Sequence, residues 1–563
     1  MRKLLLTLVP FWSLTAPGQS WQWSQQLGGS GNEYVSLAGT DQSSDVYAFG
    51  WFAGSDTQQQ YDSCFFDGDT LAGRWDSFLA KYNLDGTLAW ARAFDCPSGG
   101  VFILSAKVDT LQQRIYVVGA YTEFLSMDTV QLTTPYAGAF ISIWNYDGHC
   151  LKARNLATNP PNPLDATCTA DAVAVDGSGR ILVGGRTFPN IATLVGGEAF
   201  PGGAYMVQLD QSLEVEWVTV LSEYHDFNAA LAPKDVVIIG DRAFVHTDVY
   251  LGAEDDTLHV GNFELTGQSG RGFGLVEISV SDGTMEPLYF GGFPYTIFPF
   301  AQRMTMASDG TMLLVGNYEG AVSLWSTTIE APVGQRHAFV ARFDTAAVLS
   351  ELRTFEASTE VSLQGIHAVG LDSYLLVGRL TGTGSWDGFS FNTGSSYDFF
   401  TSQHMSNGDC SGLMTFQGAS GTGVVPSASG VFVSAVFGSP IAPNPTINIG
   451  SETHITNGLG DGIVAKLDQV VSVPQPYMLH EDDLEIYANP NRGSFRLRLP
   501  TAFNTERELQ LRIYDGTGRL VKEHLLVLDE ERPRMDVWDV GPGFYMITVS
   551  NGKRTYSGNM VVE

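Results

Sequence analysis

Two short segment types alternate along most of this 563-residue chain at a nearly constant spacing. One type has seven copies: VYAFG (46–50), IYVVG (115–119), ILVGG (181–185), AFVHT (243–247), MLLVG (312–316), YLLVG (374–378) and VFVSA (431–435). The steps between their fifth residues are 69, 66, 62, 69, 62 and 57, a mean of about 64. A regular period of this length indicates a repeat architecture.

The other type also has seven copies: DSFLAKYN (76–83), GAFISIWN (138–145), GAYMVQLD (203–210), FGLVEIS (273–279), HAFVARFD (337–344), DFFTSQHM (398–405) and DGIVAKLD (461–468). Short apolar or alternating runs bounded by Gly, Asp, Asn or Pro predict β-strands. Asp85-Gly86 before LAWARAF (88–94) predicts a tight hairpin. A unit of about four antiparallel strands predicts a β-propeller or, less often, a β-solenoid.

The period exceeds the ~40–50 residues of common propeller blades, so each blade must carry a longer loop. Residues 54–75 are one such insertion. The order of the segments favours the propeller. WQWSQQLGG (21–29) corresponds to LAWARAF but has no preceding partner strand, whereas residues 461–468 have no following one. Pairing these two strands would close a ring and remove exposed sheet edges, which predicts seven blades, with six or eight as alternatives.

The repeated pattern combines D-x-F-hydrophobic-A-K, Asp-Gly-Thr, Trp-A-R and Y-V-x-G. It is clearest at 76–94 with 115–121, at 46–54 and at 461–468. This pattern resembles the bacterial SBBP-type β-propeller repeat over roughly residues 21–470. The resemblance is weakest around AFVHT, where His246 and Thr247 replace the usual Val-Gly. It implies a fold and no particular reaction.

The N-terminus has the pattern of an export signal. Arg2 and Lys3 precede an apolar run from Leu4 to Leu14, and small residues follow. Eleven apolar residues are too few to span a ~30 Å hydrocarbon core, so residues 1–20 are predicted to be a cleaved signal peptide; an uncleaved anchor is the alternative. The net charge of −30 would repel nucleic acid.

Export makes disulfides a consideration for the five cysteines. Cys64 with Cys96 and Cys150 with Cys168 are the pairings closest in sequence, leaving Cys410 unpaired. Free buried thiols are the alternative.

The last part of the chain differs in composition. Residues 471–483 contain two prolines and an acidic run, which predicts a linker. Between residues 474 and 563, 11 Lys and Arg against 14 Asp and Glu give −3, whereas the rest of the chain carries −27. ELQLRIYD (508–515) alternates apolar and polar residues, and about seven such short strands predict a small immunoglobulin-like β-sandwich over residues 484–563.

Three motifs follow in order: ANPNRGSF, LRIYDGTGRLV and GPGFYMITVSNGKRTY. Together they closely resemble the type A sorting domain of the type IX secretion system. The matching positions are Asn489, Pro490, Asn491, Gly493, Phe495, Asp515, Gly518, Arg519, Gly543, Tyr545, Asn551, Gly552 and Lys553. The resemblance departs at Ala488 and at Ser557–Asn559. It implies a Bacteroidetes-type bacterium, handling by the type IX machinery, and release or attachment at the cell surface. A C-terminal immunoglobulin-like binding module is the alternative.

Motifs for catalysis are weak. GASGT (418–422) lacks the final glycine of a nucleophile elbow and is expected in a loop. Scattered histidines, among them His225, His246, His259, His337, His367, His404 and His454, are expected at the surface or at strand ends. Asp67 with Asp69, and Glu254–Asp256, could bind calcium but are expected to be solvated turn acids. We therefore predict no catalytic, cofactor-binding or metal-ligating residue.

Aromatic residues could stack on sugars or fill blade cores, and core packing is the favoured interpretation for Trp51, Tyr121, Trp144, Tyr318 and Trp325. The leading hypothesis is a secreted or surface-attached propeller that binds an extracellular glycan or protein through variable loops. The alternative is an extracellular polysaccharide hydrolase or lyase with its site on one propeller face. Acids and a histidine clustered on one face would favour the enzyme.

Overall fold

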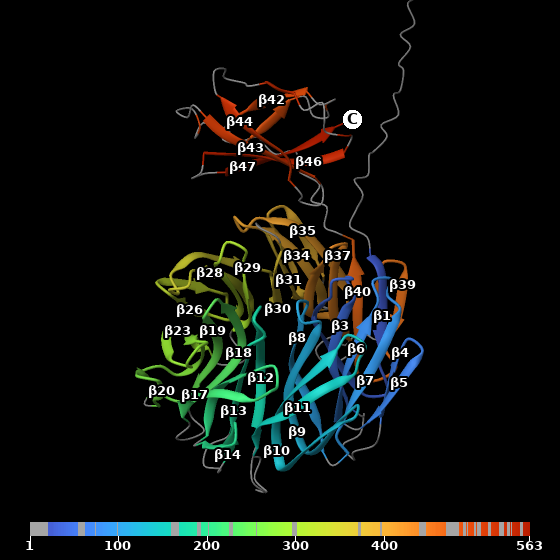
Figure 1. Ribbon diagram of the computed structural model, residues 1–563, viewed down its shortest axis with the longest axis vertical. Helices are drawn as coiled ribbons and strands as arrows, with labels where there is room; N and C mark the ends of the chain where they lie inside the picture. Colours follow the sequence, from blue (N-terminus) through green and yellow to red (C-terminus); the bar gives the residue numbers. More distant parts are fainter. Residues whose placement is uncertain are drawn as a thin grey trace, which may run out of the picture. The chain divides into compact units, whose positions relative to one another are not determined.

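The computed structural model is all-β (Figure 1). It describes residues 21–53, 62–73, 75–97, 99–158, 168–187, 193–200, 202–223, 229–254, 256–295, 301–369, 373–393, 397–438, 446–468, 484–487, 491, 494–499, 503, 508–515, 520–527, 534–536, 541, 543–551 and 555–562. The predicted signal peptide and the predicted linker lie outside these residues. No helix in the described ranges is long and apolar enough to cross a membrane. The chain divides into two compact units, residues 1–472 and 473–563.

In the first unit, four-stranded antiparallel sets follow one another along the chain. Four sets are separate sheets of consecutive strands. They are set 3, β12 (Cys168–Val175), β13 (Ile181–Thr187), β16 (Gly203–Leu209) and β17 (Val215–Glu223); set 4, β18 (Ala229–Ile239), β19 (Arg242–Leu251), β22 (Gly270–Ser279) and β23 (Met285–Tyr295); set 5, β24 (Ala301–Met306), β25 (Met312–Tyr318), β28 (His337–Phe343) and β29 (Leu349–Phe355); and set 6, β30 (Glu360–Val369), β31 (Ser373–Thr381), β34 (Asp398–Met405) and β35 (Cys410–Gln417).

Two further sets belong to one ten-stranded sheet. They are set 1, β2 (Asn32–Thr40), β3 (Val46–Ala53), β6 (Trp75–Tyr82) and β7 (Leu88–Asp95), and set 2, β8 (Val101–Asp109), β9 (Arg114–Met127), β10 (Val130–Asn145) and β11 (Cys150–Thr158). The sets join because the far end of β9 pairs with β7, where Phe94 lies opposite Met127. Every copy of the two repeated segment types lies on the second or third strand of a set, and LAWARAF (88–94) lies on the fourth strand of set 1, so those strand predictions are confirmed.

Set 7 contains both ends of the first unit. It runs β36 (Ser420–Ser427), β37 (Gly430–Phe437), β40 (Asp461–Leu467) and then β1 (Trp21–Leu27). β1 and β40 are antiparallel, with Trp21 opposite Leu467 and Leu27 opposite Gly462. The predicted pairing of the first strand with the last is therefore confirmed.

Between its second and third strands, each set carries an additional β-hairpin. In set 2 it is the extension of β9 and β10; elsewhere it is a separate pair: β4 (Asp62–Phe66) with β5 (Asp69–Gly73), β14 (Thr193–Val195) with β15 (Glu198–Phe200), β20 (Leu258–Val260) with β21 (Phe263–Leu265), β26 (Ala321–Leu324) with β27 (Thr327–Glu330), β32 (Thr383–Trp386) with β33 (Phe389–Asn392), and β38 (Thr446–Ile449) with β39 (Glu452–Ile455). These hairpins account for the long sequence period.

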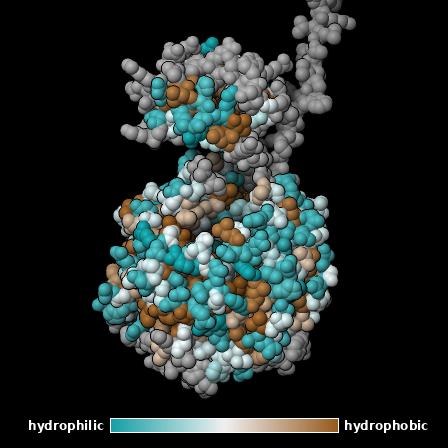
Figure 2. All heavy atoms as spheres, in the orientation of Figure 1, coloured by the Kyte–Doolittle hydropathy of each residue, from teal (hydrophilic) through white to brown (hydrophobic). Residues whose placement is uncertain are grey.

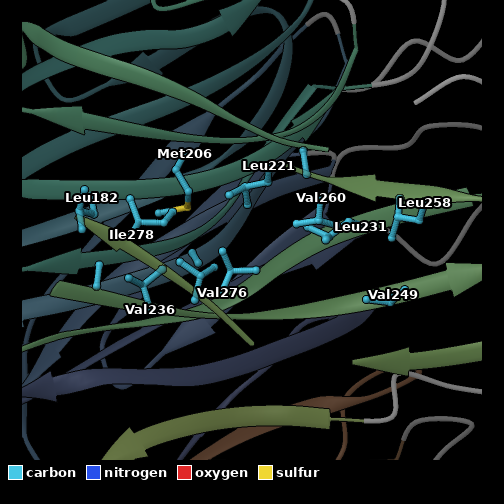
Figure 3. Packing of buried hydrophobic residues seen from close by; sticks show 14 of the residues in the cluster. Leu182, Met206, Leu221, Leu231, Val236, Val249, Leu258, Val260, Val276 and Ile278 are labelled. Atoms are coloured by element: carbon cyan, nitrogen blue, oxygen red, sulfur yellow. The ribbon is translucent and has the colours of Figure 1, made fainter. Parts of the chain in front are cut away.

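The hairpins reach the outer strand of the preceding set. Phe65 of the β4–β5 hairpin exchanges two backbone hydrogen bonds with Gly28, just after β1, at 3.2 and 2.8 Å. Val195 of β14 likewise lies opposite Ala157 of β11. Apolar residues of each hairpin thereby cover the space between two sets. Figure 3 shows this for sets 3 and 4, where Leu258 and Val260 of a hairpin belong to the same buried cluster as Leu182, Met206 and Val276.

The described residues of the first unit form seven such clusters, each shared by two sets. One joins set 7 to set 1: it includes Trp23 and Leu27 of β1, Phe432 of β37 and Phe78 of β6. The first strands also touch one another in succession, with contacts between β2 and β8, β8 and β12, β12 and β18, β18 and β24, β24 and β30, β30 and β36, and β36 and β2. Polar side chains also link neighbouring sets. Asn317 of β25, the second strand of set 5, bonds both the N–H and the C=O of Leu363 on β30, the first strand of set 6.

Tight turns explain the Asp-Gly-Thr and Trp elements of the repeat. Asp85 accepts hydrogen bonds from the Thr87 N–H (3.0 Å) and hydroxyl (2.7 Å), while Gly86 has φ +90°. A Cβ at Gly86 would lie 2.7 Å from the ring of Trp23, whose indole N–H donates to the Leu84 carbonyl at 3.0 Å. The same contact recurs between Gly148 and Trp90 and between Gly283 and Trp217. The turn glycine is thus required both by its dihedral angle and by the preceding set's tryptophan.

The second unit contains two antiparallel sheets. One is β41 (Glu485–Tyr487), β42 (Ser494–Arg498) and β45 (Arg534–Asp536); the other is β44 (Leu520–Val527), β43 (Glu508–Asp515), β46 (Gly543–Ser550) and β47 (Thr555–Val562). Both contribute to one core that includes Phe495, Leu511 and Ile547. The alternation of apolar residues in 508–515 is confirmed, because Leu509, Leu511 and Ile513 are all buried.

Candidate functional site

The motif residues of the second unit that the structure describes lie in its core or at the ends of its strands. Phe495 lies in the core, and Asn491 is buried and forms a parallel bridge with Val562 of the last strand. The hydroxyl of Tyr545 donates to the Gly541 carbonyl at 2.8 Å, fixing the entry to β46. Gly543 begins β46, Asp515 ends β43 and Asn551 follows β46. Asn489, Pro490, Gly493, Gly518, Arg519, Gly552 and Lys553 lie outside the described residues.

One edge of this unit exposes apolar side chains. Leu520, Val521 and Leu525 of the edge strand β44 are 44%, 43% and 58% exposed. Figure 2 shows hydrophobic atoms at the surface of the C-terminal unit. Sequence reasoning missed this feature because alternation predicts one buried face but not which strand lies at an edge.

In the first unit, a β-bulge recurs in the first strand of every set. In six sets the bulge lies opposite the conserved fifth position of the second strand, and the extra residues are Leu104, Asp171, Lys234, Gln302, Gln364 and Thr422. In set 1 the extra residue, Ala38, lies two positions further on. Bulges redirect side chains and are frequent near functional sites, so this predominantly polar series defines a candidate site that the sequence period did not reveal.

Cations on these first strands lack acidic partners. No carboxylate among the described residues forms an ion pair with Lys107, Lys234 or Arg303. The Arg303 guanidinium instead lies against set 4, with Nη1 3.5 Å from the Lys234 carbonyl oxygen. Nearby acids are engaged differently: Asp235 accepts the N–H groups of Val236 (3.0 Å) and Met304 (3.2 Å).

His246 of β19 is close to the same two cations. It is fully buried, and among the described residues neither ring nitrogen has a hydrogen-bond partner. Burial, with smaller contributions from Lys234 and Arg303, lowers the pKa of His246 to about 3. On the first strand of set 6, burial followed by Lys107 lowers the pKa of His367 to about 4.

Aromatic side chains from sets 1 and 2 form a chain of ring contacts. Tyr34 and Trp51 stack with centroids 6.0 Å apart and planes 10° apart, and Phe102 contacts Trp51 (6.4 Å) and Trp75 (6.2 Å) edge-on. Trp75 is 44% exposed, and the other three are half-buried. Burial raises the pKa of the Tyr34 phenol, and Arg303 opposes this.

The family model described as "Secretion system C-terminal sorting domain" matches residues 485–563. The second unit is a C-terminal sorting domain. This domain indicates export through type IX secretion to the cell surface or the extracellular space. It supports the resemblance seen in the three tail motifs over the binding-module alternative.

Comparison with curated proteins gave no match. Solved structures with similarity include a Trypanosoma rangeli sialidase in complex with sialic acid (8% identity, 86% of this chain and 87% of that chain, TM-score 0.35) and a Synechocystis apocarotenoid oxygenase mutant (9%, 81% and 94%, TM-score 0.33). A duf4221-family protein from Bacteroides vulgatus also matches (8%, 80% and 99%, TM-score 0.30). Similarity at this level supports no conclusion about ligand or activity.

The cysteine pairings considered from the sequence are not formed: the five cysteines all lie among the described residues and are buried, and no disulfide joins them. Cys64 packs between sets 7 and 1 and Cys96 between sets 1 and 2; Cys150 and Cys168 are likewise in different clusters. Proximity in sequence is a poor guide here, because consecutive strands of a repeat face different neighbours. Burial raises the pKa of Cys96 to about 11, which keeps it a thiol.

The prediction that the histidines lie at the surface or at strand ends is wrong for His246, which is fully buried in the middle of β19. His404 is also fully buried but lies next to the end of β34, as predicted. His337 and His454 are also buried, and His225 lies outside the described residues. GASGT is not a loop, because β36 begins within it at Ser420, which is buried.

Core packing is confirmed for Tyr121, Trp144 and Tyr318, whereas Trp51 and Trp325 are half-buried. Trp325 stacks on Tyr289 at 4.4 Å.

The acids considered for calcium lie in turns. Asp67 and Asp69 are exposed on the β4–β5 hairpin, and Asp69 accepts the Thr70 N–H at 2.8 Å. Glu254 is exposed, Asp256 accepts the Ala253 N–H at 2.6 Å, and Asp255 lies outside the described residues. Within the described part of the chain, no three His, Cys, Asp or Glu residues are grouped to hold a metal ion.

One serine–histidine–glutamate group joins β1 to β39. Ser24 Oγ lies 2.7 Å from His454 Nε2, and Glu452 Oε2 lies 3.7 Å from the same nitrogen. Glu452 also accepts the Ser24 N–H at 3.0 Å and bonds its hydroxyl directly. In a catalytic triad the acid orients the other ring nitrogen. Here acid and serine share Nε2, so the arrangement holds β1 in place.

Proposed function

We propose that this chain is a secreted or surface-attached binding scaffold: a closed, seven-bladed β-propeller of the SBBP type, delivered by its sorting domain in a Bacteroidetes-type bacterium. Residues 1–20 act as the signal peptide in this proposal, and residues 484–563 as an immunoglobulin-like sandwich. The match of residues 485–563 to the sorting-domain family carries the proposal.

Three observations support the closed ring. β1 and β40 pair although about 440 residues separate them in sequence. The contacts of the first strands return from β36 to β2. The cluster of Trp23, Leu27 and Phe78 joins set 7 to set 1, as other clusters join consecutive sets. In a propeller these would be the seven blades and seven blade interfaces.

Two features support binding as the role of the ring. Seven hairpins and the long connections beside them provide variable surface on a rigid framework. The Tyr34–Trp51 stack and the half-exposed Trp75 offer ring faces of the kind that contact ligands. A polysaccharide hydrolase or lyase is the second hypothesis carried from the sequence, and assays for turnover alongside binding would distinguish the two.

The export part of the proposal is tested by deleting residues 480–563. We expect the truncated protein to fold and accumulate in the periplasm, because the two units form separate compact bodies. Fractionation with antibodies against the first unit measures the distribution, with the full-length chain as control. Normal appearance of the truncated protein at the surface or in the medium would contradict the proposal.

A further inference from the structure

Four aromatic side chains of sets 1 and 2 contact one another outside the buried clusters. Trp51 stacks on Tyr34 with ring centroids 6.0 Å apart, and Phe102 contacts both Trp51 (6.4 Å) and Trp75 (6.2 Å) edge-on. Trp75 is 44% exposed, and the other three are half-buried. Among the described tryptophans of the first unit, Trp51 and Trp75 are the two that pack into none of the seven clusters. Core packing therefore does not account for these rings.

The repeated fold does not require aromatic residues at these positions. Trp51 directly follows the fifth residue of the repeated second-strand segment. The residue at this position in sets 2 to 7 is small, aliphatic, polar or charged: Ala120, Arg186, Asp248, Asn317, Arg379 and Val436. Tyr34 and Phe102 lie opposite this position on the first strands of sets 1 and 2. Small residues take their place in sets 3, 4, 6 and 7: Thr169, Ala232, Ser362 and Ser420. A requirement of the fold would apply to every set, so sets 1 and 2 carry these rings for another reason.

The neighbouring backbone holds the exposed ring in place. A Cβ at Gly100 would lie 3.1 Å from the Cβ of Trp75 and 3.6 Å from the Phe102 ring, so this glycine lets both side chains lie close to the chain. Trp75 is thus positioned by Gly100 and Phe102 although much of its surface is exposed. A side chain that is fixed before binding loses little conformational entropy when a ligand packs on it.

The residues beside the rings are uncharged. Two rows of paired residues cross β2, β3 and β6 at this end of set 1, Asn32–Ala53–Trp75 and Tyr34–Trp51–Ser77. Neither row contains an acidic or basic residue, although the chain has 61 Asp and Glu and a net charge of −30. The carboxamide of the half-buried Asn32 offers both a donor and an acceptor. Ligand sites combine apolar walls with a few polar groups, so this surface suits an uncharged ligand that has an apolar face and hydroxyl groups.

A pyranose ring has this chemistry, because one of its faces presents C–H groups and its rim carries hydroxyl groups. We propose that Trp51, Phe102 and Trp75 form a binding platform for a neutral saccharide. The C–H faces of the sugar pack on the aromatic rings, and Asn32 bonds its hydroxyl groups. The negative charge of the chain disfavours an acidic glycan. This inference rests on the proposed binding function and names its ligand class.

The test is calorimetric titration of the full mature chain with neutral hexasaccharides of glucose, mannose, galactose and xylose, and with hexagalacturonate as the acidic counterpart. The variants are Trp75→Ala, Trp75→Phe, Phe102→Ala and Asn32→Ala. The matched control is Phe263→Ala, because Phe263 is 41% exposed and stacks on Phe290 at 5.1 Å in set 4, away from the platform. Circular dichroism and melting temperature check the fold of each variant.

We expect at least one neutral hexasaccharide to bind more tightly than hexagalacturonate. Trp75→Ala should weaken that binding about tenfold, because it removes a whole ring contact. Trp75→Phe keeps a ring and should weaken it less, and Phe263→Ala should leave it unchanged. Saturation should also shift the tryptophan fluorescence of the parent chain, and the shift should be smaller in Trp75→Phe. Trp75→Ala removes an exposed side chain, so it remains informative if Phe102→Ala fails to fold.

Other outcomes overturn the inference. Unchanged saccharide affinity in folded Trp75→Ala and Phe102→Ala would exclude the platform and leave a binding scaffold with its site elsewhere. Tighter binding of hexagalacturonate than of every neutral probe would exclude a neutral ligand, and binding of none of the probes would exclude a saccharide. The proposed function fails in a different way: chromatography of the titrated samples that shows a shortened hexasaccharide would make the chain an enzyme, while the platform and its ligand class would stand.

Discussion

Sets 6 and 7 have the same strand order but different covalent connections. In set 6, β34 turns directly into β35, and the turn is closed by hydrogen bonds between Met405 and Asp409 (2.9 Å) and between Gly408 and Met405 (2.8 Å). In set 7, the corresponding strands β40 and β1 are paired neighbours in the sheet, but no turn connects them, because β1 is the first and β40 the last described strand of the first unit in sequence. The same four-stranded sheet is thus made once with a turn and once without it.

Side chains compensate for the missing turn. Alternate residues of β1 form one polar row: Gln22 bonds Asp468, Ser24 bonds Glu452 and His454, and Gln26 donates to the Ile455 carbonyl at 2.7 Å. Most of these partners belong to the β38–β39 hairpin and its end.

The other face of β1 is apolar, with Trp23 and Leu27 buried against set 1. An unconnected strand is therefore held by a polar row and an apolar row at once, whereas β35 needs only its turn and its core. The comparison teaches that closure by chain ends depends on side chains that the repeat pattern does not encode.

Removing β1 is the strongest challenge to this comparison. Deleting residues 21–27 leaves β40 as an edge strand, paired only with β37, and removes Trp23 and Leu27 from the core. Loss of each such side chain costs about 2–5 kcal/mol, so the loss is comparable to the 5–15 kcal/mol that stabilises a typical domain. We expect the first unit to unfold or aggregate, measured by circular dichroism and size-exclusion chromatography.

The control for that deletion is removal of residues 480–563, which lie in the other unit. It should leave the thermal transition of the first unit unchanged. A deletion variant without residues 21–27 that melts like the parent would show that set 7 does not need its fourth strand.

Gly86 tests the contact by which β1 reaches the next set. Gly86→Ala places a methyl group at φ +90°, 2.7 Å from the ring of Trp23. Backbone strain of about 1 kcal/mol and displacement of the indole, costing a further 1–3 kcal/mol, should together lower the free energy of unfolding by about 2–4 kcal/mol.

Gly310→Ala is the matched control, since Gly310 has φ +82° but open space around its Cβ position. Denaturant unfolding of both variants separates strain from packing. Equal losses would mean that the Trp23 contact contributes nothing.

Much of the fold could be predicted from the sequence because period and patterning are local signals. The second and third strands of each set were identified. The pairing of β1 with β40 was predicted because residues 21–29 have no partner strand before them and residues 461–468 have none after them. The hairpins were not identified, because segments such as Leu258–Val260 are too short to show a period. The cysteine pairings failed since contacts between sets are not encoded by distance along the chain.

The candidate site was not predictable in the same way. The Arg303 guanidinium lies 3.5 Å from the Lys234 carbonyl oxygen although the two residues are 69 apart in sequence, and the bulges beside them shift the register without any composition signal. The sorting domain was the opposite case: its motifs are turn and core residues in fixed order, as Phe495 and Tyr545 show, and these are visible in the sequence alone.

The pH dependence of the free energy of unfolding also distinguishes sets 6 and 7, because each contains a buried histidine in a different environment. His404 of β34 occupies a position that is Phe343 in set 5 and Leu467 in set 7, and burial lowers its pKa to about 4. Its Nδ1–H donates to the Gly408 carbonyl at 3.1 Å. Because the unfolded chain takes up this proton near pH 6.5 and the folded chain does not, stability falls as the pH drops from about 6.5 towards 4.

His404→Phe should therefore remove about 2 kcal/mol of the loss in unfolding free energy between pH 7 and pH 5. Urea denaturation at the two pH values measures it. Burial also lowers the pKa of His454 in set 7, but Glu452 opposes this, so His454→Phe should change the pH dependence less. If His454→Phe changes the pH dependence of the unfolding free energy as much as His404→Phe does, or more, set 6 is not the main source of the loss of stability in acid.

The smallest expected effect concerns the polar row itself. Ser24→Ala removes the hydroxyl that bonds His454 Nε2 at 2.7 Å and Glu452, leaving two polar groups short of a partner. A loss of about 1–2 kcal/mol follows for a buried site of this kind. The matched control is Ser411→Ala on β35, the fourth strand of set 6, whose hydroxyl donates to the Gln403 carbonyl at 3.2 Å. Because β35 is held by its turn, Ser411→Ala should lower the free energy of unfolding by less than Ser24→Ala does, and urea denaturation of the two variants measures both losses. If Ser411→Ala costs as much as Ser24→Ala, the polar row is no substitute for a turn, and β1 is held by its pairing with β40 and by Trp23 and Leu27.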